Sequence, residues 1–202
     1  VEEGASVLAV DNSEEALLET IERVAPLDGV METYIGDATK SQSVASMIAA
    51  CMSRFGRLDI LVNNVGGSKK GGPVDLSEED WDSQIDQNLK SVFLGCKYAI
   101  PELEKDGGGA IVNIASTSGT RWTGSAQVAY AATKAGVIQL SKVVAMEYAS
   151  KKIRVNAIAP GQLHTPMVEA RLAGQRTGGD VETLLKQRLA RIPLGFMGDG
   201  ND

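Results

Sequence analysis

The chain has 202 residues, 43% of them hydrophobic and 23% charged, and its 20 basic and 26 acidic side chains give a net charge of −6. This length suits one globular domain, and the acidic balance argues against a nucleic-acid or anionic-membrane surface, because both require clustered Lys and Arg. No apolar run reaches the roughly 18 residues of a membrane span, and two cysteines, Cys51 and Cys96, are too few for a disulfide scaffold. We therefore expect a soluble, cytoplasmic protein without a nucleic-acid or membrane partner.

The first part of the chain alternates short apolar runs with helical patterns. Strand-like runs occupy residues 6–10, 30–35 and 58–62, and helical periodicity covers residues 14–24 and 41–55. Continuous rather than alternating apolar runs are typical of parallel strands that are buried on both faces. The alternation of strands and helices predicts an α/β fold.

The second part continues this alternation after a loop rich in Gly and Lys at residues 67–73. Ser77 is a candidate N-cap for a long helix that we expect to run to about Glu104, with Pro101 ending or kinking it. The pattern then predicts a strand at residues 110–115, a polar loop, a helix at about 127–150 and a strand at 153–158. From about residue 165 to 195 we expect a helical excursion that covers the substrate.

The single histidine, His164, restricts the chemistry that this chain can perform. A Ser-His-Asp or Cys-His hydrolase would have to use it, and no Gly-x-Ser-x-Gly elbow is present. A zinc site normally draws on closely spaced Cys and His, and the sequence has neither a Cys-x-x-Cys pair nor a second His. We expect no metal site.

Asp11 follows the first strand-like run, where dinucleotide-binding folds place an acid that binds ribose hydroxyls. The Gly-rich turn expected about 20 residues earlier would lie upstream of Val1. The alternative is that Asp11 only caps the helix that follows. The cluster Gly66 to Gly72 lacks both common phosphate-binding glycine patterns, so we interpret it as a surface loop near a substrate cleft.

Tyr130 and Lys134 are the strongest local signal for chemistry. Residues four apart share one helical face, so the phenol and the ammonium project together. A free phenol has a pKa near 10, and a neighbouring cation lowers such a pKa, which suits proton transfer to a carbonyl or from an alcohol. Ser116, at the end of a predicted strand, could hydrogen-bond the same substrate oxygen. The alternatives are a core Tyr with a solvated Lys, an N-capping Ser116, and an exposed Asn88 in the long helix.

Taken in chain order, the motifs of this sequence resemble those of the short-chain dehydrogenase/reductase family over nearly the whole chain. The matching positions are Asp11, Asp37, Asn63-Asn64-Val65-Gly66, Asn88, Ile111-Val112-Asn113-Ile114-Ala115-Ser116, Tyr130 with Lys134, and Pro160-Gly161 with Thr165. Three features depart from the family pattern. Val65 replaces the usual Ala, the interval from Ser116 to Tyr130 is one position longer than in many members, and the first strand with its Gly-rich turn and the last strand are absent.

The resemblance implies a Rossmann-like, doubly wound parallel sheet in a three-layer α/β/α arrangement. Residues 1–202 would then form a single, partial NAD(P)-binding domain. The implied activity is an NAD(P)-dependent dehydrogenase or reductase that acts on the CH–OH group of a small alcohol or ketone, of the sugar, polyol or cyclic alcohol class. Members are often homotetramers or dimers, and we expect the same here.

The resemblance also assigns roles to individual residues. Tyr130 would be the general acid/base, Lys134 would assist it and hold the nicotinamide ribose, Ser116 would orient the substrate oxygen, and Asn88 would support a water relay. The residues implied in cofactor binding are Asp11 for the adenosine ribose, Asp37 and Ala38 for the adenine, Asn64 for the ribose region, and Leu163 and Thr165 for the nicotinamide and phosphates, together with Tyr130 and Lys134.

Asp11 also predicts the choice of cofactor. A carboxylate pairs with free ribose hydroxyls and repels a 2′-phosphate, and the next residues, Asn12 and Ser13, are not basic. We therefore expect NAD to be preferred over NADP.

Two other hypotheses remain open at this point. One is a non-catalytic dinucleotide-binding relative that keeps the fold, and the other is a methyltransferase that uses Asp11 for its cofactor ribose but leaves Tyr130 and Lys134 without a role. We also expect this chain to be a fragment of a longer protein that is inactive or poorly folded by itself, because losing a central strand leaves unpaired edges inside a sheet.

Overall fold

The computed structural model describes residues 1–163, 185–186 and 189–199. The chain divides into two compact units, Val1–Ala159 and Pro160–Asp202. His164, Thr165 and most of the predicted excursion at 165–195 lie outside the described residues.

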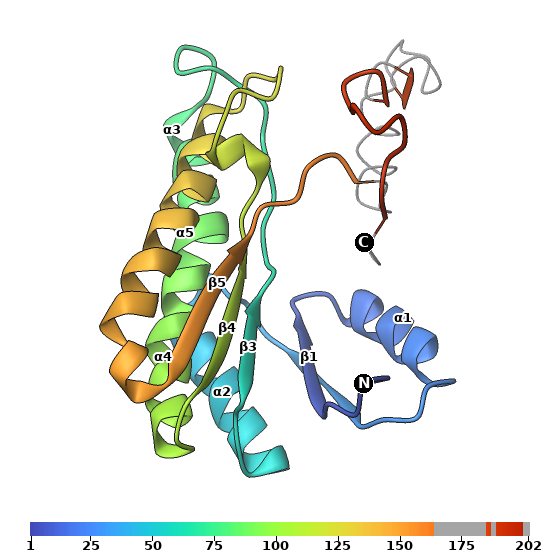
Figure 1. Ribbon diagram of the computed structural model, residues 1–202, viewed down its shortest axis with the longest axis vertical. Coiled ribbons are helices and arrows are strands. Elements are labelled where there is room, and N and C mark those ends of the chain that lie inside the picture. Colours follow the sequence, from blue (N-terminus) through green and yellow to red (C-terminus); the bar gives the residue numbers. More distant parts are fainter. Residues whose placement is uncertain (164–184, 187–188, 200–202) are drawn as a thin grey trace. The chain divides into compact units, whose positions relative to one another are not determined.

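The first unit alternates parallel strands with helices, as the sequence predicts (Figure 1). Its strands are β1 (Val7–Asp11), β2 (Met31–Ile35), β3 (Ile60–Asn63), β4 (Gly109–Ile114) and β5 (Ile153–Ile158). Its helices are α1 (Glu14–Val24), α2 (Ser41–Phe55), α3 (Glu78–Ile85), α4 (Ser91–Lys105) and α5 (Val128–Glu147), with shorter turns η1 (Asp86–Lys90), η2 (Thr117–Gly119) and η3 (Ala149–Lys151).

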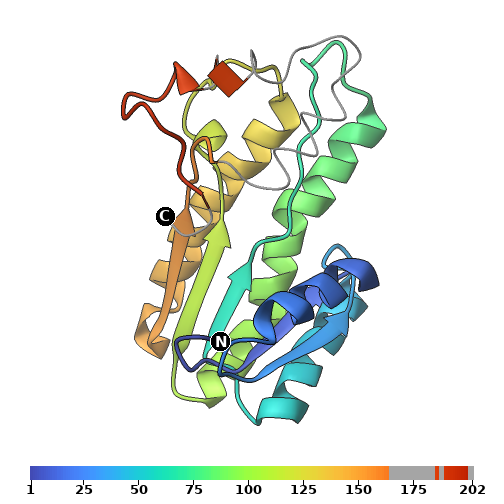
Figure 2. The ribbon, with the colours of Figure 1, turned by 90° about the vertical axis from the view of Figure 1, so that its right-hand side faces the viewer.

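All strand pairings are parallel, and they form two sheets instead of one. One sheet has the order β1-β2 and the other β3-β4-β5, whose strands point the same way in Figure 2. Within the described residues no pairing joins β1 to β3. The expectation that each apolar run is buried on both faces is wrong at several strands, because Ile35 of β2, Ile60 and Val62 of β3, and Ile158 of β5 are all more than half exposed. Among the described residues, the helices that pack against the sheet containing β3 are α4 and α5.

Helices α1 and α2 pack on the β1-β2 sheet, and α4 and α5 pack on the β3-β4-β5 sheet, which is consistent with the three layers of a Rossmann fold. Val44 and Met47 of α2 pack with Val10 and Tyr34 of the β1-β2 sheet, while α1 contacts both strands through the other face. The main core joins α4 and α5 to the β3-β4-β5 sheet. Its deepest members, all 2% exposed or less, are Val92, Ala99, Leu103, Ile111, Ala115, Val137 and Ile153.

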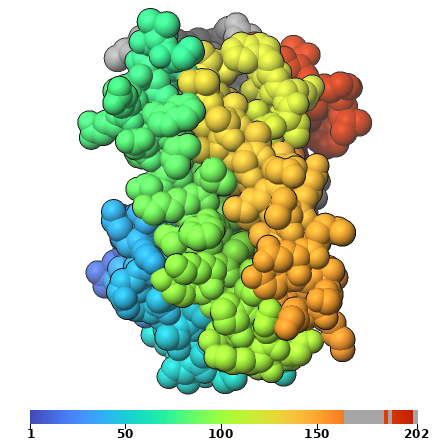
Figure 3. All heavy atoms as spheres, turned by 90° about the vertical axis from the view of Figure 1, so that its left-hand side faces the viewer, coloured from blue at the N-terminus to red at the C-terminus, as the bar shows by residue number. Residues whose placement is uncertain are grey.

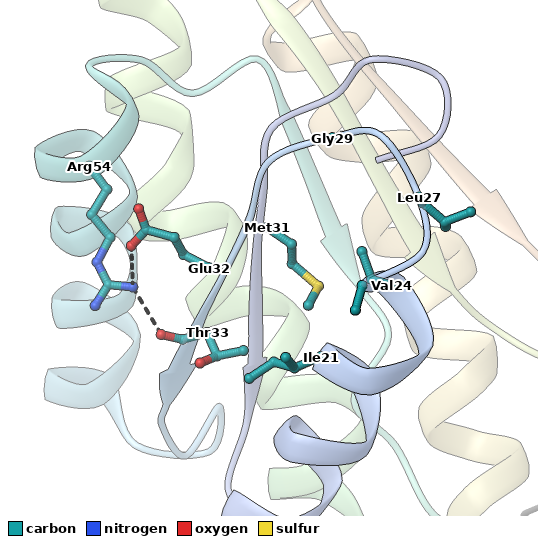
Figure 4. A pocket seen from close by; sticks show the side chains of 9 residues that line it. Ile21, Val24, Leu27, Gly29, Met31, Glu32, Thr33 and Arg54 are labelled. Atoms are coloured by element: carbon teal, nitrogen blue, oxygen red, sulfur yellow. Dashed lines mark hydrogen bonds and ion pairs between the residues drawn. The ribbon is translucent and has the colours of Figure 1, made fainter.

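The free edge of β2 is covered by a charged side chain from α2. Arg54 donates a hydrogen bond to the Thr33 carbonyl over 2.9 Å, forms an ion pair with Glu32 and lies 5.8 Å from the centre of the Tyr34 ring. A shallow pocket of about 490 Å³ lies beside it, between the end of α1 and the start of β2 (Figure 4). A cation at a sheet edge opposes pairing with another strand, which is the role that we assign to Arg54.

The long helix expected from Ser77 to Glu104 is interrupted. Ser77 caps α3 by accepting a hydrogen bond from Asp80 N, as predicted, but a π-helical turn, η1, separates α3 from α4. Pro101 does not end the helix either, since α4 continues to Lys105. The fully buried Leu103 anchors the turn after Pro101 in the core, which offsets the missing backbone hydrogen bond.

Among the described residues, no helix is both long and apolar enough to cross a membrane. Nor do three or more of their His, Cys, Asp or Glu side chains gather as metal ligands would.

Candidate active site

Tyr130 and Lys134 lie on one face of α5, and Lys134 is buried. Its side chain is 3% exposed, and its Nζ atom lies 5.7 Å from the centre of the Tyr130 ring. The same Nζ donates a hydrogen bond to the Ile114 carbonyl at the end of β4, over 2.6 Å. Burial lowers the pKa of Lys134 from 10.5 to about 8. The helix and the strand end together hold a desolvated amine beside a phenol.

Ser116 follows β4 and begins the short turn η2. Its Oγ accepts a hydrogen bond from Ser118 N over 3.1 Å, so the N-capping interpretation of Ser116 is correct. That bond uses a lone pair of the hydroxyl and not its proton. Gly119 brings this turn against α5, because a Cβ on Gly119 would lie 2.6 Å from the backbone of Lys134 and Ala135. Ser116 and the Tyr130 helix are therefore parts of one local structure.

Asn88 is fully buried in the π-helical turn, so the alternative of an exposed amide is wrong. Its Oδ1 accepts a hydrogen bond from Gly67 N over 3.0 Å, and its Nδ2 donates to the Gly67 carbonyl over 2.9 Å and to the Gln84 carbonyl over 3.0 Å. A π turn inserts one residue into a helix and is frequent at functional sites. Here the π turn contains Asn88, whose buried side chain binds the backbone of the loop after β3.

Gly66 fills the space between Asn88 and Lys134. A Cβ at Gly66 would lie 2.9 Å from Asn88 Oδ1 and 3.2 Å from Lys134 Nζ, which leaves no room for a side chain. Further along the same loop, Gly71 N donates to the Ala126 carbonyl, and Val128 N donates to the Gly71 carbonyl. The loop therefore runs from Lys134 to the first turn of the Tyr130 helix.

The residues predicted to bind the adenosine half of a cofactor lie after β1 and β2. Asp11 Oδ1 accepts from Ser13 N over 2.9 Å, and Ser13, not Asp11, is the N-cap of α1. Asp37 Oδ1 accepts from the Thr39 hydroxyl and backbone N–H, bonds that lower the pKa of Asp37. In both carboxylates these bonds use one oxygen, Oδ1, so the local turns do not occupy the whole group.

The remaining predicted positions are less informative. Asn64 is exposed after β3, and Ala38 is half-buried beside the core formed by α2 and α4. Leu163 belongs to the second unit, where it forms a short bridge with Gly198. Thr165 lies outside the described residues.

A polar chain that our sequence reasoning missed connects the sheet to α5. Asn63 donates to Asn113 over 2.8 Å, Asn113 donates to Ser141 over 2.9 Å, and Ser141 donates to the Val137 carbonyl over 2.7 Å. Gly95 on α4 is part of this arrangement, since a Cβ there would overlap Asn63 Oδ1. An Asn inside an apolar strand run was the signal that could have revealed it.

The comparisons with known proteins agree with this geometry. A sequence profile described as short chain dehydrogenase matches residues 1–176. The 3-oxoacyl-acyl-carrier-protein reductase FabG of Thermotoga maritima is 38% identical over 197 residues, which are 98% of this chain and 76% of that protein.

Two solved structures are also similar. A crystal structure from Burkholderia xenovorans, assigned to the short-chain dehydrogenase/reductases, is 55% identical with a TM-score of 0.96 and matches 100% of this chain and 76% of its own. An NAD⁺-bound xylitol dehydrogenase is 27% identical with a TM-score of 0.89 and matches 98% of this chain and 79% of its own.

The fold and the arrangement of Ser116, Tyr130 and Lys134 define a Rossmann-fold oxidoreductase. The chain belongs to the short-chain dehydrogenase/reductase family. Membership implies a nicotinamide cofactor and a small-molecule substrate with a CH–OH or carbonyl group.

Proposed function

We propose that this chain carries the catalytic groups of an NAD-preferring dehydrogenase/reductase, with Tyr130 as its general acid/base. The observation that carries this proposal is the buried Lys134, whose ammonium lies beside the Tyr130 ring and is tied to the Ile114 carbonyl. A buried cation destabilises the fold unless it is paired, and such groups cluster at functional sites. The position of Lys134 beside a phenol therefore supports a role in proton transfer. A non-catalytic relative has no use for this arrangement.

The residues fit the cofactor at its two ribose positions. Asp11 can offer its second carboxylate oxygen to the adenosine ribose, and Lys134 has three N–H donors, of which Ile114 uses one. When bound, the nicotinamide supplies the chemistry of hydride transfer. The proton chemistry belongs to the protein.

In alcohol oxidation, Tyr130 as phenolate accepts the proton of the substrate hydroxyl while the carbon loses hydride. In ketone reduction, the Tyr130 phenol returns that proton to the oxygen. The Ser116 hydroxyl donates a hydrogen bond to the same oxygen and orients it. Lys134 stabilises the phenolate through its charge, and Asn88 holds the loop that encloses Lys134.

The decisive variant is Tyr130→Phe. Because general acid/base catalysis contributes about 10²- to 10⁴-fold, we expect turnover to fall by at least about 10²-fold. NADH binding, measured by its fluorescence, should remain. Tyr148→Phe is the matched control, since it removes a phenol hydroxyl at the other end of α5 and should leave turnover intact. Unchanged turnover in Tyr130→Phe would favour the non-catalytic alternative.

Preference for NAD rests on Asp11. Its carboxylate would pair with the free 2′-hydroxyl of NAD and repel the 2′-phosphate of NADP. The NAD⁺-bound state of the similar xylitol dehydrogenase supports the same choice. We expect kcat/KM for NADH to exceed kcat/KM for NADPH. Asp11→Asn should reduce the ratio of these two values, because it weakens the binding of NADH. A wild-type preference for NADPH would refute this assignment.

For the substrate we propose an alcohol or ketone of the polyol, sugar or cyclic alcohol class. The likeness to xylitol dehydrogenase supports a polyol, whereas the likeness to FabG leaves an acyl-carrier substrate as the competitor. Initial rates with polyols, cyclic diols and a 3-oxoacyl thioester would separate these classes. Turnover of the thioester alone would overturn our choice.

We also propose that the protein forms homo-oligomers through α4 and α5, whose outer faces adjoin in Figure 3. This face exposes Phe93, Val143 and Met146, the last to 80%. A shallow hollow on α5, lined in part by Val143 and Met146, marks the same surface. Light scattering should give a dimer or tetramer, and Met146→Lys should shift the mass towards the monomer.

A further inference from the structure

Gln84 is a buried amide that the proposed mechanism does not use. It lies on α3, one helical turn before Asn88, and its side chain is 2% exposed. A polar side chain is buried at a cost unless its polar atoms are paired. The partners of Gln84 therefore indicate why the position is not apolar.

The partners of Gln84 come from the loop after β3 and from Asn88. Its Oε1 accepts a hydrogen bond from Lys69 N over 3.2 Å and a longer one from Asn88 Nδ2 over 3.4 Å. Its own backbone carbonyl accepts from the same Nδ2 over 3.0 Å. The Gln84 side chain thus binds both the loop backbone and the Asn88 side chain, which itself binds the loop.

Three side chains hold the short segment from Gly67 to Lys69 against the π-helical turn. Asn88 pairs with both backbone groups of Gly67, and Gln84 pairs with the N–H of Lys69. The Gln87 carboxamide lies so close to Gly67 that a Cβ there would be 2.7 Å from its Oε1. The segment is fixed at two successive points by amides from one helical face.

The position of this segment determines the surroundings of Lys134. Gly66, which directly precedes it, lies between Asn88 Oδ1 and Lys134 Nζ with no room for a methyl group. Without the Gln84 bond, the backbone of this segment would be paired with the helix only at Gly67, while the Lys69 side chain would remain ion-paired with Asp80. Gly66 could then move away from the ammonium. Packing beside Lys134 therefore depends on a bond that Gln84 makes.

We propose that Gln84 is a positioning residue that fixes residues 67–69 on the π-helical turn and thereby holds Asn88 and Gly66 against Lys134. This inference rests on the proposed function for its effect on turnover, but not for its effect on the loop. An apolar side chain of equal size would fill the same volume and leave Lys69 N without this acceptor. The hydrogen-bond acceptor, and not the volume, is the required feature.

Two substitutions separate the acceptor from the volume. Gln84→Met keeps the length of the side chain and removes the acceptor, and Gln84→Glu keeps an acceptor for both N–H donors. Ser141→Ala is the matched control, because it removes a buried polar group on α5 that bonds Asn113 and Val137 instead of the loop. Thermal unfolding of each variant shows which of them remain folded.

Amide hydrogen exchange at Gly67 and Lys69 is the first readout, and it requires no enzymatic activity. In Gln84→Met we expect exchange at both amides to rise about tenfold, which corresponds to the loss of about one buried hydrogen bond. Gln84→Glu should restore slow exchange, and Ser141→Ala should not change it. Wild-type exchange rates in Gln84→Met would overturn the proposal, whether or not the protein turns over a substrate.

Steady-state kinetics is the second readout. In Gln84→Met we expect kcat to fall about tenfold with little change in the KM of the alcohol, and Gln84→Glu to recover most of that loss. Ser141→Ala should keep kcat even where its melting temperature falls. Faster loop exchange with an unchanged kcat would overturn the positioning role, whereas an inactive wild-type protein would count against the proposed function and leave the exchange test intact.

Discussion

Replacing Lys134 with methionine should make the folded protein more stable at neutral pH while it abolishes turnover. Burial lowers the pKa of Lys134 from 10.5 to about 8, so the fold disfavours the charged amine. At about 1.4 kcal/mol per pH unit, this interval corresponds to at most about 3.5 kcal/mol. The variant also leaves the Ile114 carbonyl without its 2.6 Å hydrogen bond, and we therefore expect a net gain of about 1–2 kcal/mol.

The stability difference between the variant and the wild type should depend on pH. Below about pH 8 the amine is protonated in both the folded and the unfolded state, and the wild type carries the whole penalty. Between about 8 and 10.5 the unfolded state binds more protons, so the free energy of unfolding of the wild type rises with pH. The advantage of Lys134→Met should therefore be constant near neutral pH, shrink through this interval and be lost above it.

Urea unfolding of both proteins at pH 7, 8, 9 and 10 measures this difference. Lys142→Met is the matched control, since it makes the same substitution at an exposed position of α5 and should change the free energy of unfolding by less than about 0.5 kcal/mol. A variant that is less stable than the wild type at pH 7, or whose advantage does not shrink with pH, would refute the reasoning. Either result would mean that other interactions in the folded protein offset the free-energy cost of burying the charged Lys134 amine.

Three further predictions follow from the same contacts. Gly66→Ala should lower kcat by at least about tenfold, because its methyl group would displace Asn88 Oδ1 and crowd Lys134 Nζ, and NADH titration should show whether cofactor binding falls with it. Asn113→Ala should reduce the free energy of unfolding by about 2–3 kcal/mol in urea titrations, since it removes the donor to Ser141 and the acceptor for Asn63; a loss below about 0.5 kcal/mol would show that the polar chain is dispensable. Burial raises the pKa of Cys96 to about 11, so iodoacetamide at pH 8 should label it only after unfolding, as mass spectrometry of the peptide would show.

Much of the fold could be predicted because its signals are local. The strands and helices from Val7 to Phe55 repeat the apolar runs and helical periods of the sequence almost residue for residue. The capping role of Ser77 was also visible, because an N-cap is defined by its next few residues. The interruption of the following helix was not visible, since a π turn depends on what the helix packs against and not on helical propensity.

The candidate site was only partly predictable for the same reason. The spacing of Tyr130 and Lys134 places them on one helical face in any α-helix, and the structure keeps them there. That Lys134 would be buried and bound to the end of β4 depends on a contact across 20 residues. The exposure of Ile60 on β3 likewise depends on which helices and strands surround it, and our expectation for it failed.

The sequence by itself determined the α/β class, the order of the elements, the Tyr130–Lys134 pair and the family, because these depend on residue type and on spacings of a few positions. The tertiary structure alone decided that Asn88 grips the loop 21 residues before it, that Gly66 adjoins Lys134, and that Asn63 and Asn113 pair across 50 residues. Such contacts form when the core between the sheet and α4 and α5 closes. The number of residues between two partners does not predict such a contact, because only the packed core brings their atoms within hydrogen-bond distance.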